Sequence, residues 1–98
     1  MILVRNVFRL KFGKVKEAKE IWKEGLALQK KMGLDTGRIL TDMTGPFYTL
    51  VFEHSFKSLT DLENSMKTIM GSKEWQQWYQ KFTPLVESGF REIYTIVE

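Results

Sequence analysis

Residues 47–56 read FYTLVFEHSF, the segment of this sequence with the clearest structural preference. Aromatic and β-branched residues dominate it, which is the composition of a β-strand. The preceding segment, residues 37–44 (GRILTDMT), predicts a second strand. Only Gly45 and Pro46 separate the two segments, and this pair is typical of a turn. We therefore predict an antiparallel hairpin.

The segments on either side of this hairpin show two different periodicities. Residues 2–12 alternate between apolar and polar side chains, as a strand does, whereas residues 14–32 change to helical spacing. Ser58 to Asp61 resembles a capping box at the start of a helix, and Pro84 is expected to kink or restart a later one. The predicted elements are strand 2–12, helix 14–32, strands 37–44 and 47–56, helices 59–70 and 72–88, and strand 89–97.

This order of elements is the split βαβ pattern of the ferredoxin-like fold. It predicts an α+β protein with a four-stranded antiparallel sheet, helices on one face, and the first and third strands in the centre. A chain of 98 residues is the size of one domain, so we expect a single domain over residues 1–98.

The predicted sheet has two unequal faces, and this bears on assembly. The more apolar sides of strands 2–12 and 47–56 are assigned to the helices. The opposite face still carries an apolar patch that monomers seldom leave exposed, made of Leu3, Val7, Phe47 and Val51. We therefore predict a homodimer that packs sheet to sheet across a two-fold axis.

Composition excludes several classes of function. The chain has no cysteine and a single histidine, His54, so disulfides, thiol catalysis and multi-histidine metal sites are not expected. No apolar run approaches the roughly 20 residues of a membrane span, and Arg5 interrupts the N-terminal apolar run that a signal peptide would need. We expect a cytoplasmic protein with no membrane span and no bound metal.

The charge pattern raises nucleic acid as a partner, because residues 1–31 hold nine Lys or Arg and three Glu. RNA-recognition domains share the predicted element order, but their third strand carries a basic residue, two glycines and stacking aromatics. Strand 47–56 lacks that motif and carries Glu53. We predict no nucleic-acid partner and interpret the lysines as a solvated helix face.

Several short motifs at turns and at the ends of predicted elements resemble the NIPSNAP family, which lies within the dimeric α+β barrel superfamily. The similarity extends over residues 7–96. Its motifs are Gly13-Lys14, the helix with Trp22, Gly45-Pro46, Phe56-x-Ser58-Leu59, Lys73-Glu74-Trp75 and Pro84-Leu85. The resemblance implies a ferredoxin-like protomer that pairs sheet to sheet and binds ligands between the sheet and the helices of one subunit.

The resemblance also implies a range of activities. The superfamily includes cofactor-free monooxygenases, haem-degrading enzymes, isomerases and many proteins without known activity. Haem-degrading relatives are similar in carrying an asparagine on the first strand, here Asn6, but they also carry a histidine on the second helix. This sequence has no histidine between Ser58 and Ser88, so we predict no haem and no other cofactor.

Asn6 and His54 are the candidate catalytic residues. Both are polar residues on apolar strand faces, and the predicted pairing places them diagonally within reach of one site. His54 is the only side chain with an unperturbed pKa suited to a general base near neutral pH, and Asn6 would position a substrate. Alternatively, Asn6 bonds within the fold and His54 is half exposed.

Aromatic residues supply the candidate ligand-binding wall. We expect a pocket lined, with the two polar residues, by Phe8, Phe52, Trp22 and Trp78. Further aromatics that either join this wall or fill the core are Trp75, Tyr79 and Phe82. Such a pocket favours a flat, largely apolar ligand with one or two hydrogen-bonding atoms. We predict a small-molecule-binding protein; the alternatives are a cofactor-free monooxygenase- or isomerase-like enzyme and a structural or protein-interaction module.

Overall fold

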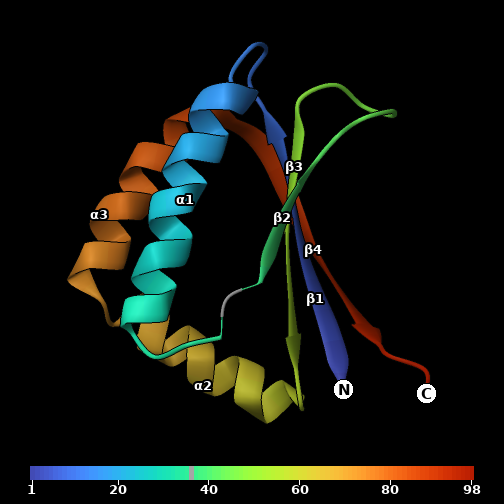
Figure 1. Ribbon diagram of the computed structural model, residues 1–98, viewed down its shortest axis with the longest axis vertical. Coiled ribbons are helices and arrows are strands. Elements are labelled where there is room, and N and C mark those ends of the chain that lie inside the picture. Colours follow the sequence, from blue (N-terminus) through green and yellow to red (C-terminus); the bar gives the residue numbers. More distant parts are fainter. Residues whose placement is uncertain (36) are drawn as a thin grey trace.

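A computed structural model describes residues 1–35 and 37–98 and shows the predicted order of elements (Figure 1). The elements are β1 (Ile2–Leu10), α1 (Val15–Lys31), β2 (Arg38–Thr41), β3 (Thr49–Phe56), α2 (Leu59–Met70), α3 (Lys73–Phe82), a 3-10 turn η1 (Thr83–Leu85) and β4 (Val86–Thr95). The ferredoxin-like α+β arrangement is therefore confirmed. Among the described residues, no helix is long and apolar enough to cross a membrane.

The four strands form one antiparallel sheet in the order β2-β3-β1-β4, so β1 and β3 are central as predicted. All three α-helices lie on the same side of this sheet (Figure 1). In the β1–β3 register, Asn6 is opposite Phe52 and Val4 is opposite His54. Because strand side chains alternate, these four residues share the helix-facing side.

The connection between β2 and β3 is longer than the predicted two-residue turn. Residues 42–48 lie outside both strands, and Gly45 within them has a φ of +102°, which favours glycine. The Asp42 carboxylate accepts a hydrogen bond of 2.9 Å from the Thr49 amide, and this bond closes the wider loop. The predicted strand ends were wrong here: the Asp42 amide still donates a 3.2 Å hydrogen bond to the Thr49 carbonyl, but the Thr49 amide bonds to the Asp42 side chain instead of its backbone.

The predicted helix over residues 72–88 was also wrong in its second half. The helix α3 ends at Phe82, and Pro84 lies in the following 3-10 turn. Proline has no amide hydrogen to continue the helix. Val86 then opens β4 opposite Leu10, and the Lys11 amide donates a 2.7 Å hydrogen bond to the Leu85 carbonyl. The chain thus joins the sheet three residues earlier than predicted.

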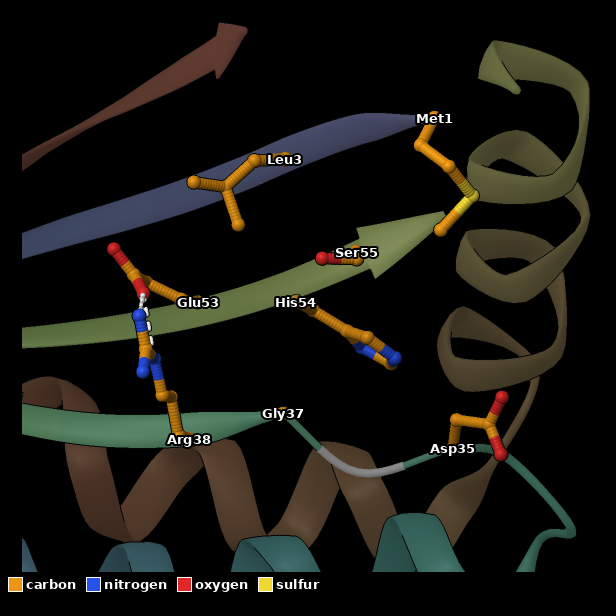
Figure 2. Close-up of a pocket in the computed structure, with 8 residues that line it drawn as sticks. All are labelled: Met1, Leu3, Asp35, Gly37, Arg38, Glu53, His54 and Ser55. Atoms are coloured by element: carbon orange, nitrogen blue, oxygen red, sulfur yellow. Dashed lines mark hydrogen bonds and ion pairs between the residues drawn. The ribbon is translucent and has the colours of Figure 1, made fainter. Parts of the chain in front are cut away.

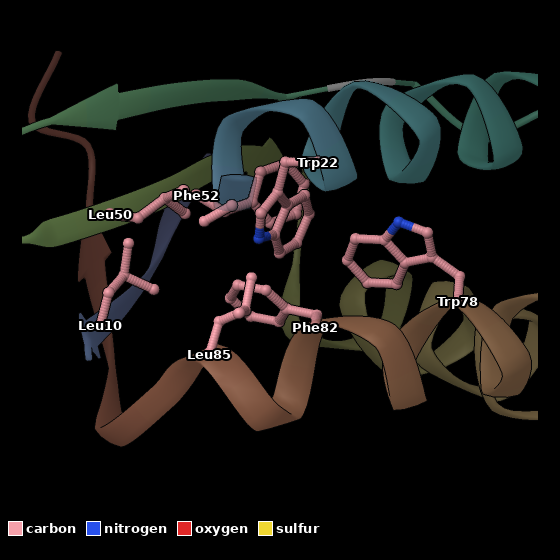
Figure 3. Close-up of a cluster of buried hydrophobic side chains, with 8 residues drawn as sticks. Leu10, Trp22, Leu50, Phe52, Trp78, Phe82 and Leu85 are labelled. Carbon is pink, nitrogen blue, oxygen red and sulfur yellow. The ribbon is translucent and has the colours of Figure 1, made fainter. Parts of the chain in front are cut away.

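The core lies between the sheet and helices α1 and α3 (Figure 3). Trp22 of α1 packs edge-on against Trp78 of α3, with ring centroids 4.7 Å apart. The Trp78 indole donates a 2.6 Å hydrogen bond to the Ile21 carbonyl. Gly25 allows this close approach, since a Cβ there would lie 2.5 Å from the Trp78 ring. The buried core comprises Leu10, Ala18, Trp22, Leu50, Phe52, Trp78, Phe82 and Leu85.

The opposite face of the sheet is bare of helices (Figure 1). Cross-strand pairing gives it one apolar row and, beside it, one charged row. In the charged row the buried Glu53 carboxylate pairs with Arg5 at 2.9 Å and with Arg38 at 2.8 Å. The apolar row is Leu40, Val51, Val7 and Phe90, and the charged row is Arg38, Glu53, Arg5 and Glu92.

Candidate functional site

A groove of about 670 Å³ opens between the helix-facing side of the sheet and helices α2 and α3. We call it the sheet–helix groove. Phe8 and Phe52 line it from the central strands, and Trp22 lines it from α1. The wall supplied by α2 and α3 is also mostly apolar and consists of Met66, Ile69, Met70, Trp75, Gln76 and Tyr79. A largely apolar groove with few polar groups is typical of small-molecule sites.

The position of α2 explains why the groove stays open. This helix begins at Leu59, and the hydroxyl of its N-cap residue Ser58 accepts a 3.3 Å hydrogen bond from the Asp61 amide, which is the Ser58 half of the predicted capping box. None of the α2 residues is buried, although the helix carries an apolar stripe. Two residues of that stripe, Met66 and Ile69, line the groove. The α2 stripe therefore faces a hollow that protein atoms do not fill.

Polar groups meet at the edge of the groove beside β4. The β1–β4 register places Asn6 opposite Arg91. The Arg91 Nε–H donates a 2.7 Å hydrogen bond to Asn6 Oδ1. Both residues line the groove, so an amide and a guanidinium are presented next to its apolar walls. Asn6 therefore lies on the helix-facing side of β1 as the sequence analysis expected, and Arg91 is a groove-lining residue that the sequence analysis did not identify.

Two further polar atoms of the groove residues are buried without a partner among the described residues. They are Trp22 Nε1, a donor, and Gln29 Oε1, an acceptor. Gln29 is only 2% exposed. It follows Ala18, Trp22 and Gly25 at helical spacing on the buried stripe of α1, so its position in the sequence could have identified it. Buried polar atoms without partners are rare and ask for a reason.

His54 lies away from the sheet–helix groove. It lines two shallow hollows near the start of β1, both of which also include Asp35. In Figure 2 the imidazole extends toward the Asp35 side, while the neighbouring Glu53 points to the other face of the sheet and pairs with Arg38. Burial lowers the pKa of His54 from its usual value of 6.5, and the Asp35 carboxylate opposes this shift.

The predicted site residues therefore divide into three groups. Asn6, Phe8, Trp22 and Phe52 line the groove together. Trp78 is buried in the core beside it, and His54 lines the separate hollows. The diagonal placement of Asn6 and His54 across β1 and β3 is observed, but the two side chains do not line a common hollow.

The aromatic wall is completed by residues for which the sequence left two interpretations open. Trp75 and Tyr79 line the groove, whereas Phe82 is fully buried in the core. Trp75 stacks on Trp78 with centroids 4.4 Å apart, so one indole of the pair faces the groove and the other the core. Over residues 1–35 and 37–98, no group of three or more His, Cys, Asp or Glu side chains is placed to hold a metal ion.

Comparison with known proteins places the chain among a set of similar folds. A family model described as NIPSNAP matches residues 5–98. A crystal structure of a NIPSNAP family protein with unknown function from Agrobacterium tumefaciens is 23% identical, with a TM-score of 0.87 over 95% of this chain and 85% of that one. An uncharacterized NIPSNAP domain protein from Burkholderia xenovorans is 18% identical, with a TM-score of 0.87 over 99% and 95%.

The fold is shared more widely than the family. A crystal structure described as an antibiotic biosynthesis monooxygenase is 12% identical, with a TM-score of 0.75 over the whole of both chains. At these identities the solved structures show the fold and nothing of the activity. No curated protein is significantly similar in sequence to this chain.

Proposed function

The chain belongs to the NIPSNAP family, and from this premise we propose that it binds a small, largely apolar or aromatic molecule in the sheet–helix groove. The observation that carries the proposal is the open space between α2 and the sheet, about 670 Å³ in volume and walled mainly by aromatic and methionine side chains. A structural or interaction module would be expected to fill this space with its own side chains, as the rest of the core is filled.

A cofactor-free monooxygenase- or isomerase-like enzyme is the second candidate. Its support is the fold shared with a protein described as an antibiotic biosynthesis monooxygenase, together with Asn6, which could position a substrate oxygen. A proton-transfer step in the groove would need a base there, and His54 lines other hollows. The position of His54 outside the groove therefore supports a binding protein over an enzyme that uses this histidine as a base.

The binding proposal is tested by closing the groove. Met66→Trp adds a large side chain to the groove wall, whereas Met43→Trp makes the same change at a loop residue that is 96% exposed and does not line the groove. We expect isothermal titration calorimetry to detect saturable binding of a flat naphthyl probe, either 2-naphthoate or 2-naphthamide, to the wild type. Met66→Trp should weaken it about 10-fold or more, the loss of roughly 1.4 kcal/mol of contact.

Met43→Trp should bind the same probe as tightly as the wild type, because it leaves the groove unchanged. Equal affinity for Met66→Trp and the wild type would place the probe elsewhere and contradict the proposal. Failure of the wild type to bind any naphthyl probe would contradict it as well.

We also propose that the chain works as a cytoplasmic homodimer joined through the bare sheet faces. The apolar row that includes Val7 and Phe90 supports this proposal, because water would otherwise contact it. The neighbouring charged row supports it too: a two-fold axis can place arginines of one copy near carboxylates of the other.

A further inference from the structure

We infer that the molecule bound in the sheet–helix groove is an apolar or aromatic carboxylate, and that its acid group binds Arg91. This inference rests on the proposed function and narrows the class of ligand. The supporting observation is that the Arg91 guanidinium, which pairs with no carboxylate among the described residues, lies beside the Asn6 amide at the edge of an apolar groove.

The charge of Arg91 is not compensated within the described part of the chain. Arg5 and Arg38 both pair with the Glu53 carboxylate, but no carboxylate lies within ion-pair distance of the Arg91 guanidinium among the described residues. Within residues 1–35 and 37–98, the one side-chain hydrogen bond of this exposed guanidinium is the 2.7 Å bond from Nε to Asn6, which is a neutral residue. The Nη groups remain available to a ligand, and their planar fork matches a carboxylate.

Asn6 positions this guanidinium and presents further donors beside it. Because an arginine Nε–H can only donate, it bonds to the Oδ1 acceptor of Asn6. The Nδ2 group of the same amide is then not used in the bond to Arg91. The two N–H groups of Nδ2 therefore lie next to the arginine at the groove edge. The Asn6 amide and the Arg91 guanidinium can therefore donate to one anion together. The register between β1 and β4 keeps the two residues opposite each other.

The remainder of the groove selects the body of the ligand. Phe8, Phe52 and Trp75 offer ring faces and edges to a flat apolar group. The unpaired Trp22 Nε1 and Gln29 Oε1 belong to other residues of the same lining. An oxygen acceptor on the ligand would satisfy the Trp22 N–H, and a hydroxyl or other donor would satisfy Gln29 Oε1.

A phosphate ester fits this site less well than a carboxylate. Arg91 is the one basic residue that lines the groove in the described chain. A phosphate dianion would keep about one charge that this exposed guanidinium does not balance, and the groove offers it no second basic residue among those described. A carboxylate carries a single charge that one guanidinium balances.

The experiment compares three probes that share one aromatic body: 2-naphthoate, the neutral 2-naphthamide and the dianionic 2-naphthyl phosphate. Calorimetry at low ionic strength measures their affinities for the wild type, Arg91→Gln and Arg9→Gln. Gln at position 91 keeps a donor toward Asn6 but removes the charge. Arg9→Gln makes the same charge change at an exposed residue of β1 that lies outside the groove lining.

We expect the wild type to bind 2-naphthoate about 5-fold tighter than 2-naphthamide, the upper end of the range for an ion pair with an exposed arginine. Arg91→Gln should bring the two affinities within about 2-fold, chiefly by weakening the binding of naphthoate. Arg9→Gln should keep the wild-type preference, and 2-naphthyl phosphate should bind more weakly than 2-naphthoate.

Equal wild-type affinities for naphthoate and naphthamide, with both weakened by Met66→Trp, would overturn the carboxylate inference and leave the binding groove standing. Tightest binding by the phosphate, or a preference for naphthoate that survives Arg91→Gln, would overturn the inference too. Absence of binding by all three probes would overturn the proposed function and this inference together.

Discussion

Asn6 and His54 are the two polar residues on the helix-facing sides of the central strands, and the fold gives them different surroundings. Asn6 accepts a hydrogen bond from Arg91 and lines the sheet–helix groove. His54 is half-buried beside the Phe56 ring, with centroids 4.4 Å apart, and shares its hollows with Asp35. The same kind of sequence signal therefore marks a groove residue in one case and a surface histidine in the other.

The lowered pKa of His54 predicts a pH dependence of stability. Burial favours the neutral imidazole in the folded protein, so the unfolded chain takes up the proton first as the pH falls. This contribution to stability is fully present above pH 6.5 and is lost as the pH falls through the folded-state pKa. In denaturant melts between pH 7.5 and pH 5, we expect the wild type to lose more free energy of unfolding than His54→Gln.

Direct titration of the imidazole by NMR provides the second measurement. The pKa of His54 should lie below 6.5 in the wild type and should fall further in Asp35→Asn, because the Asp35 carboxylate favours the charged form. A wild-type pKa at or above 6.5, or a rise in Asp35→Asn, would show that burial does not dominate at this residue.

Helices α1 and α3 meet at one close contact, and this contact determines how the aromatic core packs. Gly25 of α1 faces the Trp78 ring, and the Trp78 indole donates to the carbonyl of Ile21 one turn earlier. A small residue here lets the two helices approach until the indole reaches backbone. The sequence alone would read Gly25 as a weak point in the helix.

We expect Gly25→Ala to destabilise the protein by about 1–2 kcal/mol, even though alanine favours helix formation, because overpacking of a tight core outweighs that gain. The added Cβ would lie 2.5 Å from a ring carbon of Trp78, which is too close without movement. Urea denaturation followed by circular dichroism measures the loss.

Gly71→Ala is the matched control for this prediction. Its Cβ would have the Lys67 carbonyl at 3.4 Å as its nearest neighbour, and its φ of −80° suits alanine. This variant should be neutral or slightly stabilising, by about 0–1 kcal/mol. If both variants behaved alike, the contact between Gly25 and Trp78 would not be limiting.

The molecule as a whole has one face covered by helices and one face bare (Figure 1). The bare face is not uniformly apolar: Glu53 is 7% exposed between two arginines, and beside this charged row lies the apolar row of Leu40, Val51, Val7 and Phe90. Alternating charged and apolar rows are suited to a specific rather than a promiscuous contact.

The proposed dimer predicts that a charge in the apolar row will separate the subunits. Phe90 is 61% exposed in the single chain, and Phe90→Glu would bring two carboxylates to the interface. By sedimentation equilibrium at micromolar concentration, the wild type should have twice the 11.6 kDa mass of the chain. The Phe90→Glu variant should have the mass of one chain.

Leu59→Glu is the control, because Leu59 is 62% exposed but lies at the start of α2, on the helix side of the sheet. It should remain a dimer. A wild type that sediments as one chain would exclude the dimer, and a dimer that persists in Phe90→Glu would place its interface on another surface.

Periodicity along the chain was enough to predict the order of the elements, the central position of two strands and the side of the sheet that faces the helices. Side chains alternate between the two sides of a strand and repeat every 3.6 residues in a helix. The buried sides of segments 2–12 and 14–32 can therefore be predicted without knowing which segments pack against them. The same rule explains why Phe8, Phe52 and Trp22 were correctly assigned to one layer.

Only the tertiary structure decided which of these residues form the groove. The register between β1 and β4 joins Asn6 to Arg91, which is 85 residues away in sequence, and no local pattern contains that information. Helix α2 contacts α3 and β3 without burying any of its residues, so its apolar stripe faces a hollow. Strand register and interhelix packing arise from contacts between distant segments, so the groove exists only once the whole chain has folded.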